Sequence, residues 1–412
     1  MVVVFVLVAI AVLALLGVLH WYVWRRVVRD TTVRGSVARR VGRIVMVALP
    51  LLTVATFVGE NAGMPFGLVR VIAWPGYLWL AVFLYLLLAL AVGELVRPLL
   101  RRKAGKTAPQ QVKAPEPVTV PAGHAPEPPV EEPEAAEDPS RRLFVSRVVA
   151  GTAAAVALGT VGYGAYGTLR GPKVKRVTVP LAKLPRSAHG LRIAVVSDVH
   201  LGPVLGRGFA QRVVDTVNAT RPDVIAVVGD LVDGNVEDLE TSVAPLAGLR
   251  ARHGAYFVTG NHEYISGAEQ WTEHVQELGL KLLANTRVEL PGFDLAGVND
   301  LRGEGYDDGP DFARALGDRD RTRAAVLLAH QPAAVHEAVR HGVDLQLSGH
   351  THGGQLWPFN FIAGLANPTL AGLERYEDTQ LYVTRGAGAW GPPVRVGAPS
   401  DITVIELASR QA

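Results

Sequence analysis

The first 24 residues of the chain, from Met1 to Trp24, form an almost unbroken apolar run. A helix of about 20 apolar residues is long enough to cross the hydrocarbon core of a bilayer, so this run predicts a membrane span. Trp21, Tyr22 and Trp24 lie at its end, as in the aromatic belts of membrane interfaces. A signal peptide is disfavoured, because no basic residues precede the run and no small-residue cleavage site follows it.

Two further apolar runs extend from Ile44 to Val58 and from Val71 to Val96. A buried core helix is the alternative for the shorter one, Ile44 to Val58. We expect residues 1–100 to form an all-α membrane region with three transmembrane helices. Seven arginines follow the first run and four basic residues follow the third, whereas residues 59–70 hold one arginine. The positive-inside rule then predicts that the N-terminus is outside and Arg101 inside the membrane.

Residues 101–139 are rich in Pro, Glu and Ala and nearly devoid of large apolar side chains. Such a segment cannot bury enough apolar surface to form a core, so we predict a disordered linker. In residues 140–170, the pair Arg141-Arg142 precedes a moderately apolar run, as in a twin-arginine export signal. An ordinary fourth transmembrane helix is the alternative. With the upstream orientation, both interpretations place residues 171–412 outside the cytoplasmic membrane.

Composition excludes several classes of function. The net charge of +3 is small and the basic residues gather beside apolar runs, so no nucleic-acid partner is expected. The chain has no cysteine, which excludes disulfides, thiolate metal sites and cysteine nucleophiles. The apolar runs hold hardly any charge, which favours anchors over a transport path. Residues 171–412, in contrast, have the balance of a soluble α/β domain with one large core.

Five short apolar runs within residues 171–412 each lead into Asp, Asn or His. The runs are predicted to be buried strands and cover residues 191–196, 224–228, 255–258, 324–328 and 343–347. The polar residues that follow them are Asp198, His200, Asp230, Asn261, His262, His330, His350 and His352. Helical patterns at Phe209–Asn218 and Ala268–Leu278 separate the early runs. Open α/β sheets build their sites at the carboxyl ends of strands, so we expect these side chains to meet.

The polar residues at these strand ends are of types that bind metals. A lone histidine at a strand end is usually structural, but donors after five successive strands are not explained by coincidence. Carboxylate and amide oxygens together with imidazole nitrogens suit manganese, iron or zinc. In extended backbone, the spacing of Asp198 and His200 directs both side chains to the same face, toward one ion.

In order and character, these blocks resemble the signature of the calcineurin-like metallophosphoesterases. The matching blocks are Asp198-x-His200, Gly229-Asp230, Gly260-Asn261-His262-Glu263, His330 and Gly349-His350-x-His352, within residues 175–407. Residues 385–407 also resemble a bacterial membrane-associated branch that includes a twin-arginine-exported phosphoesterase. The resemblance implies a four-layer α/β/β/α sandwich, in which two sheets face each other and helices cover both outer faces.

The same resemblance implies two divalent metal ions, with manganese favoured and iron or zinc as alternatives. It assigns Asp198, His200, Asp230 and His352 to the first ion and Asp230, Asn261, His330 and His350 to the second. Asp230 bridges, since two dications ~3.5–4 Å apart need an anionic group between them.

The implied mechanism is in-line attack on phosphorus by a metal-bridging hydroxide, with Asp230, Asn261 and His262 as catalytic residues. His262 protonates the leaving oxygen or stabilises the transition state, and a structural hydrogen-bonding role is its alternative.

For three acidic residues and one apolar segment, the sequence leaves two roles open. Glu263 is expected to orient His262 or to form a salt bridge. Asp233 and Asp300 are expected in loops around the site, although a loop aspartate usually marks only a turn. The segment Leu356–Leu373 is unusually apolar for a loop. It is interpreted either as a strap that packs on the core or as a lipid-facing wall beside the site.

These patterns together predict a membrane-anchored, metal-dependent phosphohydrolase with its catalytic domain outside the cytoplasmic membrane. The expected substrates are phosphoesters, in particular phosphodiesters or pyrophosphates linked to lipids or the cell envelope. A non-catalytic membrane receptor or scaffold that retains the metal-binding fold is the alternative. The sequence does not indicate the oligomeric state.

Overall fold

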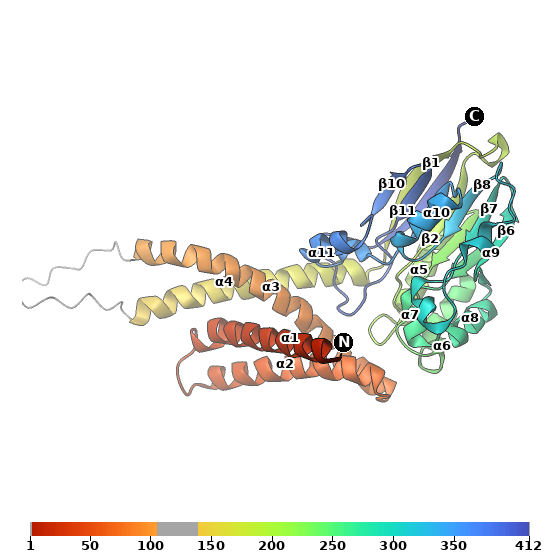
Figure 1. Cartoon of the computed structure of the whole chain (residues 1–412). Helices are drawn as coiled ribbons and strands as arrows, with labels where there is room; N and C mark the ends of the chain where they lie inside the picture. The colour runs from red at the N-terminus through yellow and green to blue at the C-terminus, as the bar shows by residue number, and fades with distance from the viewer. Residues whose placement is uncertain (1, 105–138, 412) are drawn as a thin grey trace, which may run out of the picture. The chain divides into compact units, whose positions relative to one another are not determined.

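The structure is a computed structural model that describes residues 2–104 and 139–411 (Figure 1). These residues divide into two compact units, one within residues 1–48 and 82–159 and the other within residues 49–81 and 160–412. Residues 101–104 and 139 of the predicted linker belong to helices, because the helices extend past their apolar runs. The rest of the predicted linker, residues 105–138, lies outside the described residues.

Four long helices occupy the N-terminal part of the described chain: α1 (Val2–Trp24), α2 (Val37–Asn61), α3 (Phe66–Ala104) and α4 (Pro139–Leu169). Each contains a stretch that is long and apolar enough to cross a membrane. Helix α2 begins well before the apolar run at Ile44, because the Ser36 hydroxyl accepts a hydrogen bond of 3.3 Å from the Arg39 backbone N–H. Hydropathy finds the apolar part of a helix and misses such polar first turns.

Within the first unit, charged side chains pair with one another near the basic helix ends. Glu94 of α3 accepts hydrogen bonds from Arg26 at 2.9 Å and from the Tyr22 hydroxyl at 3.3 Å. Arg97 of α3 donates to the Ser146 hydroxyl of α4 at 2.7 Å. These contacts join α3 to α4 and to the π-helical turn Arg25–Arg29 that follows α1. The pairing offsets the cost of placing charge beside apolar helices.

The second unit contains two six-stranded sheets, with strand orders β1-β12-β2-β3-β4-β5 and β10-β11-β9-β8-β7-β6. The first comprises β1 (Lys173–Leu181), β12 (Asp401–Ser409), β2 (Leu191–Val196), β3 (Val224–Val228), β4 (Ala255–Val258) and β5 (Lys281–Leu282). The second comprises β10 (Gly372–Tyr376), β11 (Thr379–Val383), β9 (Leu345–Ser348), β8 (Ala324–Leu328), β7 (Phe293–Gly297) and β6 (Thr286–Leu290).

The main core lies between the two sheets. Buried side chains from both sheets meet there, for example Ile193 and Ala226 of the first sheet and Val326 and Tyr382 of the second. Strands that alternate inward and outward residues pack in this way when two sheets face each other. Each sheet then needs a cover on its other face.

Helices cover the outer face of each sheet. On the first sheet lie α5 (Arg207–Ala219), α6 (Val236–Val243) and α8 (Ala268–Glu277), which bury Phe209, Leu239 and Trp271 against it. On the second lie α9 (Phe312–Leu316) and α10 (Val335–Arg340). The remaining short helices are η2 (Arg186–Ala188), η3 (Ala244–Gly248), α7 (Asn261–Ser266), η4 (Leu301–Tyr306), η5 (Pro332–Ala334), η6 (His352–Gly354) and α11 (Phe359–Ala366). The predicted four-layer sandwich is confirmed (Figure 1).

Four of the five predicted strands, β2, β3, β4 and β8, have the predicted bounds. The fifth, β9, begins at Leu345 rather than Val343, because the Asp344 carboxylate accepts a hydrogen bond of 2.9 Å from the Ala325 N–H and so belongs to the preceding turn. Strands β2, β3 and β4 run parallel in one sheet, and β8 and β9 run parallel in the other. Their carboxyl ends supply all the predicted site residues.

Candidate metal centre

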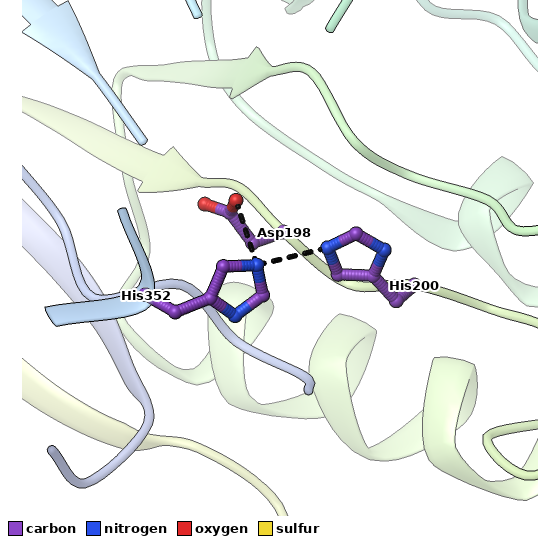
Figure 2. Close-up of side chains that lie close together, drawn as sticks. All are labelled: Asp198, His200 and His352. Carbon is purple, nitrogen blue, oxygen red and sulfur yellow. Dashed lines mark hydrogen bonds and ion pairs between the residues drawn. The ribbon is translucent and has the colours of Figure 1, made fainter. Parts of the chain in front are cut away.

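The first group of donors consists of Asp198, His200 and His352, which come from the ends of β2 and β9 (Figure 2). Nε2 of His352 lies 3.0 Å from Nε2 of His200 and 3.3 Å from a carboxylate oxygen of Asp198. Asp198 and His200 are buried, and so is most of His352. Two imidazole nitrogens and a carboxylate oxygen therefore converge on one point.

The second group consists of Asp230, Asn261, His330 and His350. Nε2 of His330 lies 3.1 Å from Oδ2 of Asp230 and 3.2 Å from Oδ1 of Asn261. Nδ1 of His350 lies 2.9 Å from the same Asn261 oxygen and 3.3 Å from Nε2 of His330. These residues follow β3, β4, β8 and β9, so the group draws on both sheets.

Asp230 lies between the two groups. Its Oδ2 is 3.1 Å from His330 of the second group and 3.9 Å from Nε2 of His200 in the first. Its Oδ1 accepts a hydrogen bond of 2.9 Å from the His262 backbone N–H, which fixes the carboxylate. A carboxylate between two sets of nitrogen and oxygen donors is the arrangement that two neighbouring dications require.

Hydrogen bonds to the far ring nitrogens prepare two of the histidines to bind a cation. Nδ1 of His330 donates to the Val228 carbonyl at 2.8 Å, and Nδ1 of His200 donates to Asp233 at 3.0 Å. With one proton held at Nδ1, the atom that faces the donor group is Nε2, and its lone pair becomes available to a cation once a second proton leaves the ring. Such outer hydrogen bonds are typical of metal-binding histidines. The residues therefore fit a divalent metal ion.

The ionisation of the donors follows from burial and from their mutual charges. Burial lowers the pKa of His350 to about 4, with help from the charge of His330. Burial likewise lowers the pKa of His352, so both rings are neutral and able to donate a lone pair. For Asp230, burial opposes ionisation, but the charges of His330 and His200 prevail and lower its pKa. Proton and cation compete for these atoms, so metal binding releases protons.

Five of the predicted ligands have a left-handed backbone: Asp198 (φ 52°), His200 (φ 49°), Asp230 (φ 51°), His350 (φ 71°) and His352 (φ 52°). Such conformations cost of order 1–3 kcal/mol each and cluster at functional sites. Asp198 and His200 thus reach the same group from a turn, not from an extended strand. The expectation that strand alternation aligns them is wrong, because the strand ends at Val196.

Glycines let the ligand loops approach one another closely. A Cβ at Gly229 would lie 2.6 Å from the Gly260 backbone and 2.8 Å from Nδ1 of His330. A Cβ at Gly349 would overlap the Ser197 hydroxyl and the Asp198 carboxylate. Gly229 and Gly349, which precede the ligands Asp230 and His350, therefore have no room for any side chain.

Asp233 lies at the site and contacts two histidines. Its Oδ1 is 2.7 Å from Nδ1 of His262 and 3.0 Å from Nδ1 of His200. Burial opposes ionisation of Asp233, but the charges and hydrogen bonds of these histidines lower its pKa to about 2. For His262, burial acts to lower the pKa, but Asp233 prevails and raises it to about 9. The sequence left Asp233 open between site and turn, and the structure places it in the site.

Glu263 holds the backbone of the site rather than His262. Its carboxylate accepts hydrogen bonds from the N–H groups of Gly260 at 2.6 Å, Asp230 at 3.0 Å and Leu231 at 2.7 Å. Burial and the charge of Asp230 raise the pKa of Glu263 to about 7. The contacts tie the loops after β3 and β4 together.

Asp300 lies further out, where it accepts hydrogen bonds from Gln331 at 2.9 and 3.0 Å.

Sequence reasoning missed Arg395, which is buried behind His352. Its guanidinium donates to the carbonyl oxygens of Gly388 at 2.6 Å, His352 at 3.0 Å and Ala398 at 3.1 Å. Nη2 also lies 3.2 Å from Nδ1 of His352. A guanidinium only donates hydrogen bonds, so in this contact the lone pair of His352 is at Nδ1 and its proton is at Nε2. A cation at Nε2 would need the other tautomer, in which Nδ1 carries the proton and no longer accepts from Arg395. No spacing pattern in the sequence marks this residue.

The α2–α3 connection comprises the end of α2, residues 62–65 and the start of α3, within residues 49–81. It belongs to the same compact unit as the sandwich and also reaches this site. Glu60 and Tyr77 line one small cavity together with His200 and Asp233. The Tyr77 hydroxyl donates to the Glu60 carboxylate at 2.7 Å. These two residues were missed as well, because nothing in the sequence connects an apolar helix pair to a site more than 100 residues away.

Comparison with known proteins places this geometry in a family. Residues 191–354 match the family model described as calcineurin-like phosphoesterase. A Danio rerio transmembrane protein with metallophosphoesterase domain is 41% identical over 261 residues, which cover 60% of this chain and 59% of that protein. An uncharacterised metallophosphoesterase of Helicobacter pylori is 39% identical over 256 residues, covering 61% of this chain and 68% of that protein. The chain belongs to the calcineurin-like phosphoesterases.

Membership of this family implies divalent metal ions, which the groups around Asp198 and Asp230 fit; a third cluster of possible donors, His200, Asp233 and His262, adjoins the first. An uncharacterised metallophosphoesterase of Bacillus subtilis is 28% identical over 284 residues, covering 66% of this chain and 98% of that protein. These similarities support the predicted superfamily. They do not extend to the twin-arginine branch, which stays a prediction.

Proposed function

We propose that this metallophosphoesterase is a membrane-anchored phosphohydrolase with a centre for two divalent metal ions. Asp198, His200, Asp230 and His352 hold one ion, and Asp230, Asn261, His330 and His350 hold the other. Manganese is the favoured metal, with iron or zinc as alternatives. The observation that carries the proposal is the convergence of these donors into two groups on either side of Asp230.

The substrates are phosphoesters, in particular phosphodiesters or pyrophosphates linked to lipids or the cell envelope. When bound, the cations lower the pKa of water and stabilise negative charge on the phosphoryl oxygens. The chain itself positions the reacting groups. The hydrogen bonds to Glu263 keep the loops in place before substrate binds and offset the cost of the left-handed backbone at the ligands.

His262 donates a proton to the leaving oxygen. Asp233 accepts from its Nδ1 at 2.7 Å, which orients the ring and leaves Nε2 for the substrate. The raised pKa of His262, about 9, keeps the ring protonated in the metal-free site, and nearby cations act to lower it. A general acid whose pKa is brought toward neutral is suited to this step.

The catalytic domain lies outside the cytoplasmic membrane, as the positive-inside rule predicts. The α2–α3 connection and the end of α4 belong to the same unit as the sandwich, and Phe66 and Leu169 pack against its core. For α2 and α3 the basic clusters lie at the opposite ends, in residues 25–43 and 97–103, whereas Arg170, Lys173, Lys175 and Arg176 follow α4 on the sandwich side. The packing and the clusters of α2 and α3 support a single orientation, with those clusters in the cytoplasm.

The proposal is tested by hydrolysis of a chromogenic phosphodiester and its monoester by the full chain in lipid nanodiscs. Manganese, zinc, magnesium and chelator are compared, beside an Asp230→Asn variant. The expected result is turnover that needs a transition metal and falls at least about a hundredfold in the variant. A folded chain that binds metal yet hydrolyses neither substrate would favour a receptor or scaffold instead.

A further inference from the structure

Helix α11 has an exposed apolar surface. None of its residues is buried, and Phe361, Ile362 and Leu365 are exposed to 64%, 61% and 89%. Trp357, just before the helix, is 48% exposed, and residues 356–366 contain no charge. The interpretation of Leu356–Leu373 as a strap on the core is therefore wrong for α11, although Leu356 and Thr369 on either side of the helix are buried. A contiguous apolar surface of this kind marks an interaction site.

The base of α11 is firmly held, so the exposure does not result from a frayed segment. The Trp357 N–H donates to the Val396 carbonyl at 2.9 Å, and the Phe359 N–H donates to the Leu356 carbonyl at 2.8 Å. Gly354, two residues after His352, is in tight contact with the backbone of Asn360 in α11. The helix is thus fixed directly to the loop that carries a predicted metal ligand.

The loop that holds α11 also contacts the end of α4. A Cβ at Gly164 of α4 would lie 2.8 Å from the Arg395 carbonyl and 3.1 Å from the Val396 side chain. Val396 is the residue that pairs with Trp357. Residues 160–169 of α4 and α11 belong to the same compact unit, so their proximity is a feature of that unit. Helix α4 is one of the helices able to cross a membrane.

The end of α4 has the composition of a membrane interface. Tyr163 and Tyr166 are exposed to 81% and 65%, and together with Arg170 and Lys173 they line a pocket whose other wall is residues 395–397, 399 and 400. Tyrosines with basic residues are enriched where a helix leaves the hydrocarbon core and meets the lipid headgroups.

We infer that α11 and Trp357 insert into the headgroup and acyl boundary of the bilayer that α4 crosses. The inference rests on the proposed membrane anchoring. Its occupant is a lipid surface, because the exposed face is apolar and uncharged and lies beside a membrane-spanning helix. The metal centre then opens next to the headgroup layer, so a phosphoester carried by a lipid reaches it without leaving the bilayer.

Site-specific fluorescence quenching in liposomes tests this placement. The chain has no cysteine, so Leu365→Cys gives a single site for an environment-sensitive dye. The same dye at Leu158→Cys in α4 reports on the membrane-spanning helix. The dye at Arg321→Cys, in the loop before β8, reports on a position expected in water. Spin-labelled lipids are expected to quench the probe at 365 several-fold more than the probe at 321.

Two results would overturn the inference in distinguishable ways. In the first, the probe at 158 is quenched while the probe at 365 is quenched no more than the probe at 321. This would show an anchored chain whose α11 stays in water. No quenching at 158 would remove the membrane anchoring, and with it this inference, but would leave the metal centre and its proposed phosphoester hydrolysis to the activity assay. All three positions are exposed, so the substitutions leave the core intact.

Discussion

Asp233 makes a prediction at the scale of single residues. Asp233→Asn removes the charge that orients His200 and His262, and loss of such an outer partner costs about tenfold to a hundredfold in activity or metal affinity. Turnover and metal titration of the full chain measure both effects. Asp215→Asn, an exposed carboxylate on α5, is the matched control and is expected to be neutral. Equal behaviour of the two variants would show that Asp233 has no positioning role.

The role of His262 is tested by the leaving group. His262→Ala is expected to slow hydrolysis of an alkyl phosphoester by about a hundredfold or more, since a poor leaving group needs a proton. The loss is expected to be much smaller for a nitrophenyl ester, whose leaving group departs without one. An equal loss on both substrates would contradict proton donation. The metal content of the variant is expected to match that of the wild type, because the ligand set proposed for neither ion includes His262.

At this scale the sequence predicted the seven donors but not their surroundings. Each donor follows an apolar run, so its position could be inferred from a local pattern. Asp233 stands three residues after Asp230 in the same loop, which is the signal that could have assigned it. Arg395 and Glu60 reach the site only through tertiary contacts, and residue type alone does not locate the left-handed backbone of the ligands, although Asp and His adopt it more readily than most residues.

At the scale of elements, the loops between strands and ligands have no room for added atoms. Gly349→Ala would push a methyl group into Ser197 and Asp198, and overpacking of this kind costs typically about 1–3 kcal/mol. Gly364→Ala in α11 meets nothing within 4 Å and serves as the control. Thermal unfolding of the full chain is expected to show a lower Tm for the first variant only. Equal Tm values would mean that the loops can relax.

The strand bounds were predictable because a short, β-branched run between polar residues has few alternatives. The exposed face of α11 was not predictable, because an apolar segment of the same composition can pack either on a core or on a lipid surface. The deciding information is tertiary, namely that α11 is fixed to the ligand loop and leaves its apolar side chains uncovered.

At the scale of the whole molecule, the α2–α3 connection completes a wall of the site. A fragment that begins at Gly171 lacks Glu60 and Tyr77 and also the packing of Phe66 and Leu169. Amide hydrogen exchange in residues 202–205 is therefore expected to be faster in the fragment than in the full chain. Residues 224–228 of the central strand β3 provide the internal control. Identical exchange in both segments would show that the helices do not support the site.

The central claim is that two groups of donors share Asp230 and bind two metal ions. The most direct measurement is a manganese titration of the full chain, with the bound metal counted per chain. The account predicts two ions for the wild type, one for Asp198→Asn, and weakened binding of both for Asp230→Asn. A single ion in the wild type, or two tightly bound ions in Asp230→Asn, would contradict the shared centre.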